Sequence, residues 1–209
     1  MPNLLSTKLK FNINEILKYI LFELNGKEPD VIVGISLGGL LAPNLATIFP
    51  ESKLILIGTG HRFKTKIPLY NRLVHIEARD ERLLLVKLLR LTPRWLFRFV
   101  YNYLNQSDDL SNQANYIRAD EVYDDAFRLS SKKIKEILEF ISKINNIELL
   151  QRLSNKTIIF AGKNDSIMPV QLSDKINSLM KNSTLIILNK IHYDICTQVD
   201  YHQLNEFIN

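Results

Sequence analysis

The sequence has a single cysteine, Cys196, among its 209 residues. One cysteine cannot form an internal disulfide, and it excludes a metal site built from several thiolates. We therefore expect a reducing, cytoplasmic setting. The sequence also lacks a secretion signal, and Lys, Arg or Pro interrupts every apolar run well before it could span a bilayer. No internal repeat or low-complexity tract is present, so we expect a soluble globular protein without a membrane span.

Positive charge is in excess, and it is unevenly distributed. The formal net charge is +5. Residues 61–100 carry ten basic and three acidic side chains, whereas residues 108–125 carry six acids, namely Asp108, Asp109, Asp120, Glu121, Asp124 and Asp125, against Arg118. Two interpretations stay open: neighbouring faces that neutralise each other, or a basic surface for an acidic partner. No nucleic-acid-binding motif accompanies the basic residues, so we expect no nucleic-acid partner.

Short, continuously apolar and β-branched runs predict strands that are buried on both faces. They lie at residues 31–35, 54–58 and 157–161; a further strand is expected at 185–188, and helical periodicity covers 13–24, 40–48, 170–180 and 199–208. Residues 61 to about 150 are mostly helical in period, with Pro93 interrupting an apolar stretch. The pattern predicts an α/β fold with a mostly parallel sheet and helices on both faces. Residues 1–60 and 147–209 form its core, and residues 61–146 form a helical insertion.

The segment Gly34-Ile35-Ser36-Leu37-Gly38 fits the pattern G-x-S-x-G between a predicted strand and a predicted helix. In that context the motif predicts a sharp turn that exposes a nucleophilic serine. We interpret the two glycines as necessary because the strained turn tolerates no bulk on either side of Ser36. The alternative is a purely structural turn.

A serine hydroxyl needs a base, and the base needs an acid that orients it. Asp165 follows the strand at 157–161, and His192 follows the strand at 185–188. Because parallel strands bring their carboxyl ends to one edge of a sheet, we expect Ser36, Asp165 and His192 to converge there. His61, which follows Gly60, is an alternative base, whereas His75 and His202 lie in helical stretches that are typical of surface residues.

The sequence resembles the α/β-hydrolase family, in particular its small cap-bearing esterases and lipases. The resemblance rests on VIVGISLGGLLAPNLA, on TIIFAGKNDSIMPV and on the strand and histidine that close the chain. It implies Ser36 as nucleophile, His192 as general base, Asp165 as orienting acid and the Leu37 backbone amide as an oxyanion donor. It also implies that residues 61–146 are a cap or lid over the site.

The family places several strands before the serine turn, whereas 35 residues precede Ser36 here. We therefore expect a core that lacks those strands and a sheet that begins at residues 31–35 with an unpaired edge. Two alternatives stay open: another chain, such as a second copy in a homodimer, covers this edge, or the chain is a fragment or minimal version of the fold.

These observations predict a serine hydrolase that cleaves a small-molecule carboxylic ester or thioester through an acyl-enzyme, without metal or organic cofactor. A subset of this prediction is an esterase for substrates on an acidic carrier protein, docked by Arg90, Arg94 and Arg98. The apolar residues of the insertion would either bury it against the core or line an acyl-chain pocket. The alternatives are a non-catalytic or degenerate hydrolase fold that binds a ligand, and other chemistry of the same triad, such as C–C bond hydrolysis or acyl transfer.

Overall fold

The computed structural model describes residues 9–104, 119–121, 123–124, 127–197 and 201–208. One parallel sheet lies at its centre, with the strand order β1-β2-β3-β4. The strands are β1 (Val31–Ile35), β2 (Lys53–Ile57), β3 (Thr157–Gly162) and β4 (Ser183–Leu188). The four predicted runs all form strands, although β4 begins two residues earlier than expected.

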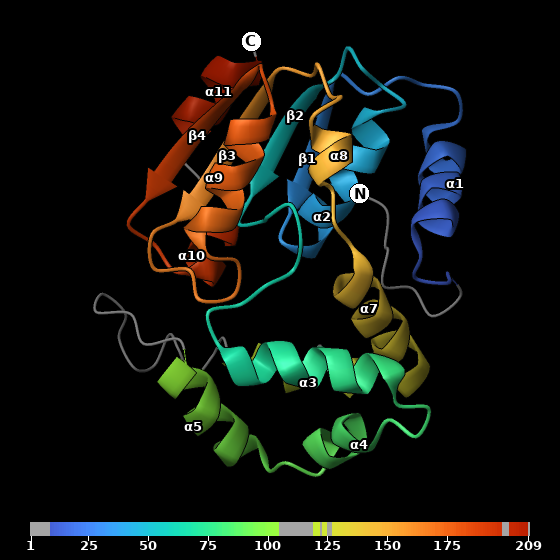
Figure 1. Ribbon diagram of the computed structural model, residues 1–209, viewed down its shortest axis with the longest axis vertical. Helices are drawn as coiled ribbons and strands as arrows, with labels where there is room; N and C mark the ends of the chain where they lie inside the picture. The colour runs from blue at the N-terminus through green and yellow to red at the C-terminus, as the bar shows by residue number, and fades with distance from the viewer. Residues whose placement is uncertain (1–8, 105–118, 122, 125–126, 198–200, 209) are drawn as a thin grey trace.

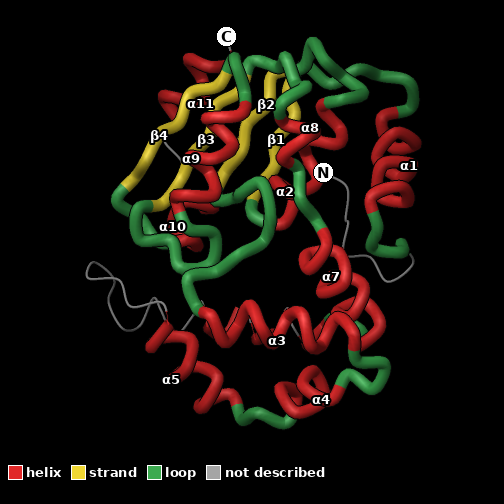
Figure 2. Tube along the Cα trace, viewed as in Figure 1, coloured by secondary structure: helices red, strands yellow, loops and turns green. Residues whose placement is uncertain are grey.

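Helices pack around this sheet, as Figures 1 and 2 show. They are α1 (Ile13–Leu24), α2 (Leu37–Ala46), α3 (Pro68–Arg79), α4 (Leu84–Arg90), α5 (Arg94–Leu104), α7 (Ser131–Lys143), α8 (Ile147–Leu150), α9 (Val170–Leu179), α10 (His192–Thr197) and α11 (Tyr201–Ile208). The sequence sets several ends: the side chain of Asn12 accepts a hydrogen bond from Glu15 N (3.0 Å), and Asn25 ends α1 in the left-handed conformation (φ 49°). The short helix α10 was not predicted.

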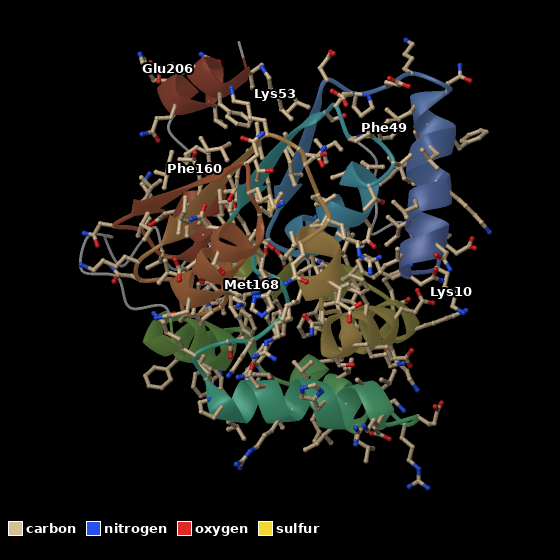
Figure 3. All side chains as sticks on the ribbon, turned by 45° about the horizontal axis from the view of Figure 1, so that its top comes forward. Lys10, Phe49, Lys53, Phe160, Met168 and Glu206 are labelled. Carbon is tan, nitrogen blue, oxygen red and sulfur yellow. The ribbon has the colours of Figure 1, made fainter. Side chains whose placement is uncertain are left out.

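Alternate residues of each strand contribute to two apolar cores, one on each face of the sheet. On one face, Ile32, Leu56 and Ile159 pack in a buried cluster with residues of α2, α8 and α9. On the other face, Ile55 and Phe160 belong to a cluster that includes residues of α10 and α11. Figure 3 shows Phe160 within the strand layer. The expected helices on both faces are therefore confirmed.

Helices α3, α4, α5 and α7 come from the chain between β2 and β3, and they lie beyond the carboxyl ends of the strands (Figure 1). A third buried cluster joins α3 and α7 to the core: Val74 and Phe140 pack with Leu40 of α2 and with Met168. In Figure 3, Met168 lies between the sheet and these helices. The insertion is thus held against the edge of the sheet where the candidate site lies.

Charged residues of the insertion pair with one another. Arg94 lies within ion-pair distance of Asp120 and Asp124, and Arg98 within that of Asp120. The interpretation that the basic and acidic runs neutralise each other is confirmed for these residues; Asp108, Asp109, Arg118 and Asp125 lie outside the described residues. Helical structure is interrupted between α4 and α5, in the segment that contains Pro93, so Arg90 lies on a different helix from Arg94 and Arg98.

Among the described strands, β1 pairs only with β2, so it forms an edge of the sheet. Val33 on this strand is 54% exposed. The predicted open edge at residues 31–35 is therefore present within the part of the chain that the structure describes. In the same part, no helix is both long and apolar enough to cross a membrane.

Candidate active site

Ser36 lies at the turn between β1 and α2 in a strained backbone conformation, with φ 49° and ψ −115°. A non-glycine residue with these angles costs about 1–3 kcal/mol, so the surroundings must hold it in place. Three hydrogen bonds do so: Ser36 N donates to Ile57 O (2.9 Å), while Ser36 O accepts from Gly39 N (3.0 Å) and from Thr59 Oγ1 (2.9 Å). The β1–α2 turn is thus tied to the last residue of β2 and to Thr59 in the loop that follows it.

The glycines in and beside this turn differ in how much space a side chain would have at each position. A Cβ on Gly34 would lie 2.6 Å from Ala42 Cβ, so Gly34 is sterically required. A Cβ on Gly38 would meet nothing within 4 Å, so our explanation of the second motif glycine by crowding was wrong. The crowded position is Gly39, where a Cβ would lie 2.5 Å from the Thr59 side chain. Close packing of α2 therefore depends on Gly34 where the helix meets β1, and on Gly39 where it meets the loop after β2.

Asp165 follows β3 and is completely buried. Its Oδ1 accepts hydrogen bonds from the backbone N–H of Ile167 (2.8 Å) and of Met168 (2.7 Å). Its Oδ2 lies 2.7 Å from His192 Nδ1. Backbone donors on one oxygen stabilise the ionised carboxylate and leave the other oxygen directed at the imidazole.

His192 is the first residue of α10, and its ring lies between the other two predicted site residues. Nε2 is 2.9 Å from Ser36 Oγ, and Nδ1 faces the Asp165 carboxylate. Because an ionised carboxylate can only accept, the neutral form of the imidazole carries its proton on Nδ1, and in that form Nε2 can accept from the serine hydroxyl. The structure therefore brings together all three residues that the sequence placed at this edge, in the order of contact that base-assisted attack requires.

Opposing effects act on the pKa of His192. Burial disfavours the charged imidazolium, but hydrogen bonds and charge interactions with Asp165 and Cys196 outweigh this effect and raise the pKa above its usual value of 6.5. Cys196 lies one turn along α10, with Sγ 4.0 Å from Nε2. Gly58, with φ 55°, leaves space for both residues, since a Cβ there would lie 2.9 Å from Cys196 Sγ and 3.6 Å from His192 Cε1.

The other histidines lie elsewhere. His61 is buried, its Nδ1 is 3.4 Å from Leu172 O, and burial lowers its pKa. His75 is exposed on α3, and His202 lies near Glu206 on α11. Within the described residues, no group of three or more His, Cys, Asp or Glu side chains is arranged to hold a metal ion.

Several residues of the site could not be recognised from the sequence. Thr59 is fully buried and holds the Ser36 carbonyl, and its own carbonyl accepts from Ser173 Oγ (2.6 Å). Tyr193, next to the histidine, donates its hydroxyl hydrogen bond to Glu121 of the insertion (2.9 Å). The sequence signal for Thr59 is its place directly after the predicted strand at 54–58; no comparable signal identifies the Tyr193–Glu121 contact.

With this geometry established, comparison with known proteins places the chain in a class. A family model for the alpha/beta hydrolase fold matches residues 6–195, so the chain belongs to the α/β-hydrolase-fold family. The predicted resemblance is thereby confirmed. A search of curated proteins found no match to the sequence.

Solved structures with the same fold include an esterase from Exiguobacterium antarcticum, with a TM-score of 0.72 and 15% identity over 97% of this chain and 76% of the other. The enol-lactonase from Burkholderia xenovorans LB400 has a TM-score of 0.72 and 14% identity, covering 96% and 74%. A meta-cleavage product hydrolase from Pseudomonas fluorescens IP01 has a TM-score of 0.63 and 18% identity, covering 97% and 71%. At these identities the likeness is one of fold.

Proposed function

We propose that the protein is a serine hydrolase that cleaves a carboxylic ester or thioester through an acyl-enzyme intermediate. The observation that carries this proposal is the continuous contact from Ser36 Oγ to His192 Nε2 (2.9 Å) and from His192 Nδ1 to Asp165 Oδ2 (2.7 Å). Family membership and the esterase and lactonase among the structural relatives support a hydrolytic reaction.

In the proposed mechanism, Ser36 Oγ attacks the acyl carbon while His192 Nε2 takes the hydroxyl proton. The proton then passes from His192 to the leaving alcohol or thiol as its bond to the acyl carbon breaks. Water attacks the acyl-enzyme with His192 again as base, which releases the acid and restores Ser36. Asp165 stays ionised throughout, and it stabilises the imidazolium and fixes the ring orientation.

The oxyanion that forms during each attack needs donors that are already in position. Leu37 is the first residue of α2, so its backbone N–H has no acceptor one turn earlier within the helix. We assign this N–H as one oxyanion donor. Helix α2 also directs the positive end of its dipole toward Ser36.

We further propose that residues 61–146 act as a cap over the site. The Tyr193–Glu121 hydrogen bond supports this role, because it links the residue beside His192 to the insertion. The cap would restrict access to the nucleophile and shape the acyl pocket.

A small-molecule substrate is favoured over a substrate carried on an acidic protein. The arginines that would dock such a carrier already have partners within the insertion: Arg90 donates to Ser131 Oγ (3.0 Å) and Leu129 O, while Arg94 and Arg98 face Asp120 and Asp124. For the open edge of β1 we propose a second copy of the chain as the partner, paired strand to strand.

Labelling with a fluorophosphonate probe tests the proposal. We expect one adduct, located by mass spectrometry on Ser36, that is absent in Ser36→Ala and strongly slowed in His192→Ala. Ser178→Ala is the matched control, since Ser178 is an exposed serine on α9 and its loss should leave labelling unchanged. A folded wild-type protein that takes up no probe, or that is labelled equally in Ser36→Ala, contradicts the proposal and favours a binding role.

A further inference from the structure

Helices α4 and α5 and the turn between them carry a set of large apolar side chains that no other part of the described chain covers. Exposure is 53% for Leu84, 60% for Leu88, 78% for Leu91, 68% for Trp95, 66% for Phe99 and 44% for Val100. We call these six residues the α4–α5 apolar face. Single exposed apolar residues are common, but a set of this size on two consecutive helices indicates an interaction surface.

The arrangement of α5 is the reverse of an ordinary surface helix. Its cations Arg94 and Arg98 are held by acids of the insertion, and Phe97 packs against Tyr123 with ring centroids 5.3 Å apart. Trp95 and Phe99, four residues apart, are left exposed. The cations of the helix are therefore paired within the protein, and Trp95 and Phe99 are directed to solvent.

Exposed cations accompany this face. Lys87 lies within α4, Arg82 two residues before it, and Arg72 and Arg79 on α3, and all four side chains are exposed. Described acids near these helices already have partners: Glu81 pairs with Lys135 (3.0 Å), Asp80 accepts from the backbone N–H groups of Arg82 and Leu84, and Glu121 accepts from Tyr193. Apolar and indole groups flanked by Lys and Arg are what a lipid surface with anionic headgroups binds: the apolar groups enter the acyl boundary and the cations contact the headgroups.

We propose that the α4–α5 apolar face docks the protein on an anionic lipid surface. Figure 1 shows α4 and α5 at the end of the molecule opposite the C-terminus, with α3 between them and the sheet, so this end can contact a bilayer without burying the rest of the protein. The helices lie on the surface and do not span it, in agreement with their lengths of 7 and 11 residues. This docking is independent of the proposed hydrolysis.

The chain provides its own probe, because Trp95 is its only tryptophan. The Ser36→Ala chain is titrated with vesicles of phosphatidylcholine alone or mixed with phosphatidylglycerol, so that ester hydrolysis cannot alter the lipid. We expect Trp95 emission to shift to shorter wavelength, and the protein to sediment with the vesicles, only when phosphatidylglycerol is present. High salt should weaken this binding.

Matched variants distinguish lipid binding through the α4–α5 apolar face from non-specific adsorption to vesicles. Leu91→Ser with Phe99→Ser, and separately Arg82→Glu with Lys87→Glu, should each weaken binding about tenfold or more. The controls are Phe22→Ser, which removes a side chain as exposed as Leu91 (78% in both), and Lys27→Glu with Lys181→Glu, which reverses two exposed charges elsewhere. These should bind as the parent does. Far-UV circular dichroism checks that every variant is folded.

Three results would overturn the inference. They are equal binding to phosphatidylcholine vesicles, no shift with either vesicle, and a Trp95 shift that appears without lipid as the protein concentration rises. The last result would mean that a second copy of the chain occupies the face. Fluorophosphonate labelling of Ser36 is unaffected by all three, so failure of this inference is distinguishable from failure of the proposed chemistry.

Discussion

At the scale of single residues, the protonation of His192 controls the proposed reaction. The imidazole must be neutral to take the proton of Ser36, and its pKa is raised above 6.5 despite burial, through Asp165 and Cys196. We therefore expect kcat/KM for an uncharged ester to rise with pH through a midpoint above 6.5. Measurement of initial rates between pH 5 and pH 11 tests this, because the pKa of His192 is raised to about 10.

Replacement of the orienting acid tests the cause of that midpoint. Asp165→Asn removes the negative charge and the acceptor that hold the Nδ1 proton, so the midpoint should fall and kcat should drop about a thousandfold or more. His75→Gln is the control, because His75 is exposed on α3 and should leave the profile unchanged. An unshifted midpoint in Asp165→Asn would mean that another group sets the acid limb.

The same contact makes stability depend on pH. A histidine whose pKa is raised by folding stabilises the folded state fully below pH 6.5, and this contribution is lost as the pH rises through the folded-state pKa of about 10. The melting temperature of the wild type should therefore fall relative to that of His192→Ala as the pH is raised from 6 to 10.

The three residues of the proposed triad could be predicted from the sequence, because each is a chemically distinctive side chain that follows a recognisable strand. Thr59 and Cys196 could not. Their roles depend on distances across the fold, such as the 2.9 Å contact of Thr59 with the Ser36 carbonyl and the 4.0 Å approach of Cys196 to the imidazole. Residue type and spacing carry no information about such contacts.

At the scale of secondary-structure elements, the packing of the turn from β1 to α2 can be tested at two adjacent glycines, Gly38 and Gly39. Gly39→Ala places a methyl group 2.5 Å from Thr59 in a close-packed interior, so it should destabilise the protein by about 1–3 kcal/mol. Gly38→Ala meets open space within α2, where alanine is the better helix former, so it should be neutral or stabilising by up to about 1 kcal/mol. Urea denaturation measures both values, and an equal loss in both variants would contradict the packing that the structure shows.

The inner strands were predictable at this scale because burial on both faces leaves continuous apolar runs, as in β3, where all six residues are buried. The expectation of burial on both faces was wrong for the edge strand β1, where Val33 is 54% exposed. The early start of β4 was missed because Ser183 and Thr184 are polar, although they pair with Thr157 and Ile158. Helix α10 was missed because six residues are too few for a helical period to be visible in the sequence. Tertiary contacts, such as those of buried Ile195 with the sheet, stabilise it.

At the scale of the whole molecule, the sequence predicted a parallel sheet interrupted by a helical insertion, because βαβ connections restrict the possible topologies. It could not predict how the insertion distributes its charge and apolar surface. The local excess of cations left two interpretations open, and the pairing of Arg94 and Arg98 with Asp124 and Asp120 decides for mutual neutralisation at these residues alone. The outward direction of Trp95 is likewise a consequence of that pairing.

The open edge of β1 leads to a prediction about the oligomeric state of the protein. If a second copy pairs with this strand, the protein should form a dimer at rising concentration in analytical ultracentrifugation. Val33→Lys, which places a charge on the edge strand, should keep it monomeric, because a charged edge disfavours strand pairing. Ile187→Lys on β4 is the matched control, since its side chain is 53% exposed against 54% for Val33.

Dimers that survive Val33→Lys but not Ile187→Lys would place the interface at β4, and a wild type that stays monomeric would exclude pairing through β1. Trp95 emission should be unchanged by this association, because the β1 edge and the α4–α5 apolar face lie on different parts of the molecule.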